Sequence, residues 1–193
     1  MHFAKTNIGW GWSNLLLLLL IVGCSASKPM IRSDYDHDTN FAAFKTFGYF
    51  QKLATDRGYE TLVTQNLKQA VTRQMQNRGI EFSQTNPDLL VNFKLKLEDK
   101  QQLRSTGYPG GYYGYRGRYY GAWGGYAYDT YTYEYTEGTL NIDVVDRQRK
   151  TMVWEGVAIG RVKQSDYDNQ QQVIDRVVAS MFKEFPVKNQ VKP

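Results

Sequence analysis

Apolar side chains recur along this chain in two rhythms, one helical and one extended. Between residues 60 and 78 apolar positions return every three or four residues, and Gly79 follows the cation Arg78. This spacing puts one apolar stripe on a helix, and glycine commonly follows the last helical turn. The segment 60–78 therefore predicts an amphipathic helix. Its apolar stripe consists of Val63, Leu67, Ala70, Val71 and Met75.

Strict alternation of apolar and polar residues begins after Pro87 and returns later in the chain. Alternation predicts strands with one buried face and one wet face, as in an antiparallel sheet covered on one side. Residues 131–145 and 152–162 predict a hairpin around the polar turn 146–150, and strong twist or a close helix contact explains Gly156 and Gly160. In the first strand Leu89, Val91, Phe93, Leu95 and Leu97 alternate with Asn92, Lys94, Lys96 and Glu98.

Both ends of the domain complete this pattern. Two short strands are expected within residues 31–50. A second helix is expected after a cap at Asp168, with a stop at Pro186. The order of elements predicts an α+β domain, an antiparallel sheet with two helices packed on one face.

Residues 107–128 interrupt the pattern with a low-complexity run of glycine and tyrosine. Because glycine loses more entropy on ordering and no aliphatic face offsets that loss, we expect a loose Gly/Tyr-rich loop between two strands. The competing view is an ordered aromatic platform for sugar rings. Its candidate binding residues are Arg116, Arg118, Tyr119 and Trp123.

The first 23 residues have the layout of a secretory signal, with the cation Lys5, an apolar run over 15–22 and Gly23 before Cys24. This run is shorter than the roughly 20 residues that span a bilayer, so a permanent transmembrane anchor is the weaker interpretation. We therefore expect a signal peptide over 1–23, a lipidated tether over 24–32, a single domain over 33–186 and a tail over 187–193.

The run from Leu20 to Cys24 resembles the lipobox of bacterial lipoproteins. That resemblance implies cleavage before Cys24 and attachment of diacylglycerol and acyl chains such as palmitate to this residue. Ser25, in place of aspartate, implies transfer to the outer membrane, with the domain facing the periplasm. Cys24 is the only cysteine of the chain, so no disulfide is expected.

Several short motifs of the mature chain together resemble the bacterial lipoprotein family known as domain of unknown function 4136. The resemblance covers residues 33–186 and implies a small lipid-anchored envelope protein, and it transfers no catalytic or binding residue. The motifs are Tyr35-Asp36 with Lys45-Thr46-Phe47, Gly79, the run from Pro87 to Val91, the run from Glu137 to Asp143, the run from Val153 to Gly156, and Phe185-Pro186.

Candidate chemistry is sparse in the mature sequence. Asp34, Asp36, His37 and Asp38 include ligand types that suit metal ions. Alternating aspartates before a turn are, however, also typical of an Asx turn, so no metal or other cofactor is expected. Asp143 and Glu155 are the candidate pair for the alternative function, an envelope glycan hydrolase. Without a catalytic signature, the chain is not expected to be an enzyme.

Basic residues give the chain a net charge of +5. Lys94 and Lys96 fall on the polar side of one predicted strand, so they join the loop residues above as a candidate binding face. Such a face can pair with anionic groups of peptidoglycan, lipopolysaccharide or an envelope protein, but it is also typical of a solvated surface. Export argues against a nucleic-acid partner. The sequence thus predicts a non-enzymatic binding or structural module of the cell envelope.

Overall fold

A computed structural model describes residues 28–107 and 128–190. Within these ranges the chain forms a six-stranded sheet with the order β1-β6-β5-β4-β2-β3. The strands are β1 (Met30–Tyr35), β2 (Thr46–Tyr49), β3 (Glu81–Phe82), β4 (Leu89–Gly107), β5 (Tyr128–Asp146) and β6 (Thr151–Val162). The helices are α1 (Leu62–Gln76), α2 (Gln164–Asp168) and α3 (Gln170–Met181), with the 3-10 turns η2 (Phe41–Ala43) and η3 (Phe182–Glu184).

The sheet is mixed, which corrects the prediction of a purely antiparallel one. β1, β6, β5 and β4 are antiparallel neighbours, but β2 is parallel to both β4 and β3. The chain leaves β2, passes through α1 and returns to β4 in the same direction, and such a crossover joins parallel strands. The two predicted N-terminal strands exist, but β1 lies beside β6 and β2 lies beside β4.

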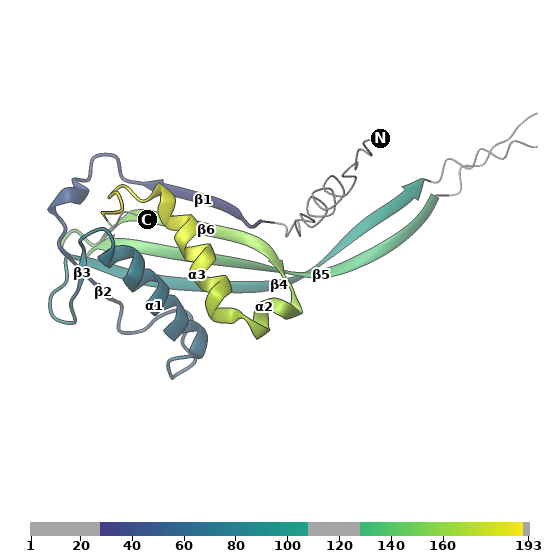
Figure 1. The fold of residues 1–193 in the computed structure, drawn as a ribbon, viewed down its shortest axis with the longest axis horizontal. Coiled ribbons are helices and arrows are strands. Elements are labelled where there is room, and N and C mark those ends of the chain that lie inside the picture. Colours follow the sequence, from purple (N-terminus) through teal and green to yellow (C-terminus); the bar gives the residue numbers. More distant parts are fainter. Residues whose placement is uncertain (1–27, 108–127, 191–193) are drawn as a thin grey trace, which may run out of the picture.

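Helices α1 and α3 pack against each other on the same side of the sheet (Figure 1). Thr61 caps α1 by accepting a hydrogen bond from the Thr64 N–H at 3.1 Å. Gly79, predicted as the helix stop, has a φ of +75°, a left-handed conformation that favours glycine. The expected cap Asp168 instead ends α2, and Asn169 precedes α3. No helix in the described ranges is long and apolar enough to cross a membrane.

The hydrophobic core lies between this helix layer and the sheet. Trp154 of β6 is only 1% exposed, and its ring centroid lies 5.1 Å from that of Phe182 and 5.3 Å from that of Phe185. A Cβ atom on Gly156 would lie 2.4 Å from the Trp154 ring and 3.1 Å from Met181 of α3. The absence of a side chain at Gly156 therefore lets the indole and α3 approach the sheet, as the sequence suggested.

Strands β4 and β5 continue beyond the body of the domain as a two-stranded ribbon, residues 100–107 and 128–135 (Figure 1). The last pair between β5 and β6 is Thr136 with Val162, whereas β4 and β5 stay paired as far as Gly107 and Tyr128. The ends of the predicted Gly/Tyr-rich loop therefore belong to strands. Residues 108–127 lie outside the described residues, so the looseness of this segment stays a prediction.

Candidate binding face on the open side of the sheet

The sheet face opposite α1 and α3, which we call the open face, carries the polar positions of the central strands. In β4, Phe93 is fully buried under the helices, so the next side chain, Lys94, points the other way and is exposed. Lys96 lies two residues further along and is also exposed. Across the strand pair, Lys94 lies opposite Asn141 and Lys96 opposite Thr139. The two lysines predicted as a binding face thus share one surface.

Glu98 partly neutralises this basic strip. Its carboxylate oxygens lie 2.5 Å from the Lys96 Nζ and 3.1 Å from the Lys100 Nζ. Hydrogen bonds from Lys96 and then Lys100 lower the pKa of Glu98, and the same contact raises the pKa of Lys100. Lys94 forms no ion pair within the described residues. Of these three lysines, Lys94 is the one without an ion pair to Glu98, and its charge acts instead on Asp143 of the same face.

An arginine and two tyrosines form a cluster where the ribbon leaves the body. The Arg161 guanidinium lies 4.1 Å from the ring centroid of Tyr135 and 5.7 Å from that of Tyr133. Its Nη2 donates a hydrogen bond to the Gln102 side chain at 2.9 Å. The two tyrosine rings lie 6.3 Å apart in a stacked arrangement. We call Gln102, Tyr133, Tyr135 and Arg161 the Arg161 cluster.

The carboxylates suggested for hydrolysis are neighbours on the same face. Asp143 of β5 lies directly opposite Glu155 of β6. Burial raises the pKa of Asp143, and the charge of Glu155 raises it further. The Asn141 Nδ2 donates a hydrogen bond to Glu155 at 3.1 Å. A carboxyl group with a raised pKa beside a second carboxylate is the kind of pair that acid catalysis uses.

The residues considered as metal ligands mainly organise a turn after β1. Asp36 accepts hydrogen bonds from the Asp38 N–H at 3.0 Å and the Thr39 hydroxyl at 2.6 Å, and lies 3.6 Å from the Arg149 guanidinium. The His37 ring packs against Tyr35 with centroids 4.2 Å apart. Within the ranges that the structure describes, no three histidine, cysteine or acidic side chains gather in a metal-binding group.

Two other carboxylates support the backbone. Asp88 accepts hydrogen bonds from the N–H groups of Lys45 at 2.8 Å and Thr46 at 2.9 Å, which ties β2 to β4. Burial opposes ionisation of Asp88, but these bonds outweigh it and lower its pKa. Asp146 accepts from the N–H groups of Gln148 and Arg149 in the β5–β6 turn. Both contacts are structural.

Five sequence-predicted site residues lie outside the described residues, so their roles stay predictions. They are the lipidation site Cys24 and the loop residues Arg116, Arg118, Tyr119 and Trp123. Sequence reasoning missed Arg161, the central residue of the cluster. The alternation of residues 152–162 was a usable signal, because it puts Arg161 on the same face as Glu155.

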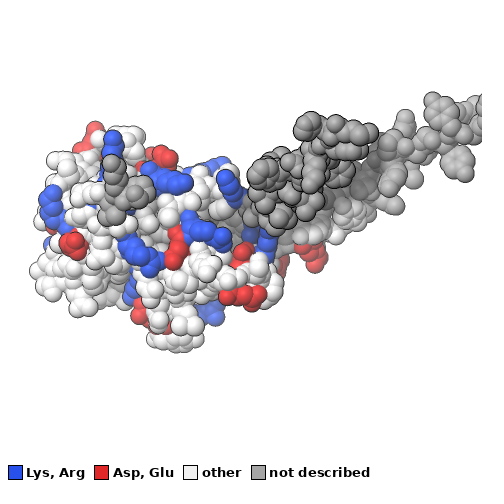
Figure 2. Space-filling model, viewed as in Figure 1, with Lys and Arg blue, Asp and Glu red and all other residues white. Residues whose placement is uncertain are grey.

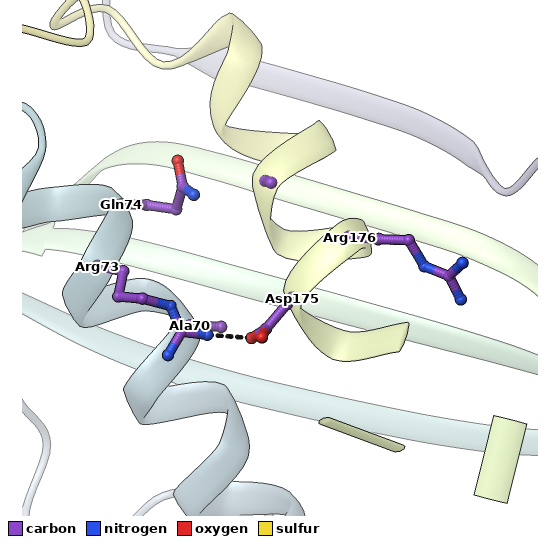
Figure 3. A pocket seen from close by; sticks show the side chains of 6 residues that line it. Ala70, Arg73, Gln74, Asp175 and Arg176 are labelled. Atoms are coloured by element: carbon purple, nitrogen blue, oxygen red, sulfur yellow. Dashed lines mark hydrogen bonds and ion pairs between the residues drawn. The ribbon is translucent and has the colours of Figure 1, made fainter. Parts of the chain in front are cut away.

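Two cavities lie on the other side of the molecule, in the helix layer. One of about 280 Å³ lies between α1 and α3, where the Arg73 guanidinium and the Asp175 carboxylate form an ion pair across the two helices (Figure 3). The other, of about 420 Å³, lies where α1 and α3 end. Neither cavity is lined by Asp143 or Glu155, so the carboxylate pair belongs to neither of them.

These features define an α+β domain in which helices cover one face of a mixed sheet and, among the described residues, no helix covers the polar, tyrosine-bearing face. The chain matches the family model for the domain of unknown function DUF4136 over residues 31–187. It therefore belongs to the DUF4136 family, as the sequence motifs indicated. A search of curated proteins found no match.

Solved structures were also found that are similar to this chain. A PDZ domain protein from Parabacteroides distasonis ATCC 8503 aligns with a TM-score of 0.53 at 11% identity, over 83% of this chain and 37% of that one. The chain thus spans little more than a third of that protein, and the likeness concerns the fold alone. A DUF4136 family protein from Bacteroides thetaiotaomicron VPI-5482 gives 0.48 at 17% identity, over 86% and 100% of the two chains.

Proposed function

We propose that this chain is a lipid-anchored lipoprotein of the cell envelope whose open face binds an envelope partner without catalysing a reaction. The DUF4136 match and the signal-like start with Cys24 support the envelope assignment. Ser25 after Cys24 supports an outer-membrane location, and we propose that the domain faces the periplasm.

The Arg161 cluster is the observation that carries the binding proposal. Tyrosine rings offer flat apolar surfaces for sugar rings, and a guanidinium pairs with carboxylate or phosphate. Tyr133 is 45% exposed, and Lys94 is exposed on the same face. This combination suits an anionic glycan such as peptidoglycan or lipopolysaccharide, or an acidic envelope protein.

Retention of the purified protein on isolated peptidoglycan tests this assignment. We expect Arg161→Gln to weaken retention by about tenfold, since it removes a charged hydrogen-bond donor from the cluster. Arg57→Gln is the matched control, because Arg57 is exposed in the loop between β2 and α1 and lies outside the cluster. Equal retention of both variants would reject the Arg161 cluster as the peptidoglycan site. The same comparison with lipopolysaccharide tests the second glycan.

The anchor has its own test. Cys24→Ser is expected to abolish incorporation of a labelled fatty acid and to release the protein from membrane fractions, because only the cysteine sulfur accepts the diacylglycerol. A serine variant that keeps both the label and the membrane association would contradict lipidation at Cys24. Fractionation of the wild-type envelope then shows whether the protein is in the outer or the inner membrane.

The neighbouring Asp143 and Glu155 favour one alternative, a glycan hydrolase. Two adjacent carboxyl groups with a raised pKa on Asp143 are suited to acid–base work on a glycosidic bond. Release of new reducing ends from peptidoglycan, lost in both Asp143→Asn and Glu155→Gln, would establish this activity. No release by the wild-type protein would leave binding as the function.

A further inference from the structure

The cavity of about 420 Å³ is built by two segments that are distant in the sequence, one around the end of α1 and one that runs from α3 through η3 to Asn189. It lies at the C-terminal ends of α1 and α3, and the segment after η3 returns to close one side. Gln190 fixes this segment, since its backbone N–H donates to the Asn77 carbonyl at 2.8 Å and its side chain donates to the Arg78 carbonyl at 3.2 Å. These hydrogen bonds therefore hold the wall of the cavity in place.

Arg78, which lines this cavity, carries a charge that no described acid balances. The residue is only 6% exposed, and its guanidinium donates to the Gln74 carbonyl at 2.8 Å and the Phe182 carbonyl at 2.6 Å. Its Nε is buried without a hydrogen-bond partner. Burial lowers the pKa of Arg78, with no carboxylate to offset the effect. A buried charge without a counter-ion is costly, so a bound anion here would stabilise the fold.

The remaining charged residues around the cavity are also basic. Lys183 and Lys188 line it together with Arg78, and no aspartate or glutamate does. Cations also stabilise the ends of helices by pairing with free carbonyls, and Arg78 has that role. Lys183 and Lys188 are exposed, and within the described residues they form neither an ion pair nor a hydrogen bond to these carbonyls. Their charges thus remain available to a ligand.

The adjoining smaller cavity extends this cationic surface. The two cavities share Gln74 and Ala179, and Asp175, the acid that lines the smaller one, is paired with Arg73. Arg176 lines the same cavity and adds another cation. Figure 2, viewed from the helix side, shows basic side chains across this face with acidic ones among them.

We propose that the cavity formed by Arg78, Lys183 and Lys188 binds a phosphate group, either as inorganic phosphate or as the phosphate of an anionic headgroup. A phosphate offers several acceptor oxygens to donors that approach from different sides, and it carries more charge than one carboxylate. The cavity lies on the helix side of the domain, so this site is independent of the open face.

Calorimetric titration of the full chain in nonionic detergent at low ionic strength tests the site. Inorganic phosphate is one ligand, dihexanoyl phosphatidic acid is the second, and dihexanoyl phosphatidylcholine is the control without net charge. We expect saturable binding of phosphatidic acid, weakened by about tenfold or more when Lys183→Gln and Lys188→Gln are combined. Both lysines are exposed, so this variant is expected to fold, and an unchanged unfolding temperature verifies that.

A second double variant distinguishes binding at the cavity from nonspecific attraction of the anion to a basic protein. Lys28→Gln with Lys52→Gln removes the same charge from exposed positions away from the cavity, and its affinity is expected to stay within about twofold of wild type. Saturable binding of inorganic phosphate as well would show that the free ion suffices, and binding of phosphatidic acid alone would assign the headgroup. Equal affinity of the two double variants, equal binding of phosphatidylcholine, or no saturable binding at all would overturn the proposal.

Discussion

The two faces of the central strands differ in what their side chains contact, although they alternate residue by residue. Phe93 and Trp154 are at most 1% exposed beneath the helices, whereas Lys94 and Glu155 point to the open face. The first set holds the helix layer on the sheet. In the second set Lys94 is exposed, and Glu155 accepts a hydrogen bond from Asn141. Core packing and the proposed binding face are thus separated by a single residue step along each strand.

The ribbon extends this contrast along the length of one strand. Leu89, Val91 and Phe93 at the start of β4 are fully buried, while Leu97 is 50% and Leu103 is 74% exposed. All five follow the same alternation, but the helices cover only the first part of it. The apolar pattern of a strand therefore persists where no described element buries it, and exposed apolar side chains of this kind are typical of interaction surfaces.

Removing the largest core side chain should have the greatest effect. Trp154→Ala is expected to lower the free energy of unfolding by about 3–5 kcal/mol, because it leaves a cavity against Phe182 and Phe185. Chemical denaturation measures this loss. Tyr131→Ala, an aromatic residue of the ribbon that is 47% exposed, should change stability by less than about 0.5 kcal/mol. Similar losses in both variants would contradict the division between body and ribbon.

A smaller loss is expected from the carboxylate that ties β2 to β4. Asp88→Ala removes the acceptor for two backbone N–H groups, so it should lower the free energy of unfolding by about 1–3 kcal/mol at pH 7. Because its folded pKa is lowered, Asp88 stabilises the fold above its unfolded pKa of about 3.9 and loses this effect as the pH falls through the folded value. The difference between variant and wild type should therefore shrink below about pH 4. A pH-independent difference would contradict this role.

Removing the charge of Asp143 on the open face should change the free energy of unfolding in the opposite direction. The raised pKa of Asp143 means that its ionised form disfavours the fold above the folded pKa and that this penalty disappears below the unfolded value. Asp143→Asn is expected to raise stability at pH 7 by at most about 0.5 kcal/mol, because water screens a half-exposed group. Thermal unfolding at pH 7 and pH 3 tests this, and a variant destabilised at pH 7 would show that the Asp143 charge supports the fold.

The smallest effect on stability is expected in the part of β4 that belongs to the ribbon. Leu103→Ser should leave the free energy of unfolding within about 0.5 kcal/mol of wild type, since the side chain is already mostly in water. Leu89→Ala, the matched position in the body, should lose about 2–5 kcal/mol. A large loss in Leu103→Ser would mean that the ribbon is buried against something in the folded protein.

Much of the fold was predictable because its elements have regular periods. The helix over 60–78, its stop at Gly79 and the long strands appeared in the sequence as spacings of three to four or of two residues. The parallel position of β2 was not predictable, since its four residues carry no signal of direction, and direction depends on where the α1 crossover returns the chain. β3, with two residues, is too short to have a period.

The candidate site was predictable only in part. Lys94 and Lys96 follow from alternation within one strand, which needs no knowledge of neighbours. The Arg161 cluster depends on the register between β4, β5 and β6. A bulge between Val144 and Val145 shifts that register, so counting residues from the turn pairs the wrong positions. The buried charge of Arg78 depends on the contact of α1 with η3, which no local pattern reports.

In-cell photocrosslinking most directly tests the claim that the partner proposed for the open face meets the protein there. A photoreactive residue is placed at Lys94 or Lys96 on the open face, and at Gln69 or Gln76 on the exposed side of α1 as matched controls. We expect a discrete crosslinked band from the Lys94 and Lys96 positions, and we expect Arg161→Gln to abolish it. The α1 positions should give no band of the same gel mobility. The same species formed with equal yield from α1, or unchanged in Arg161→Gln, would contradict this claim.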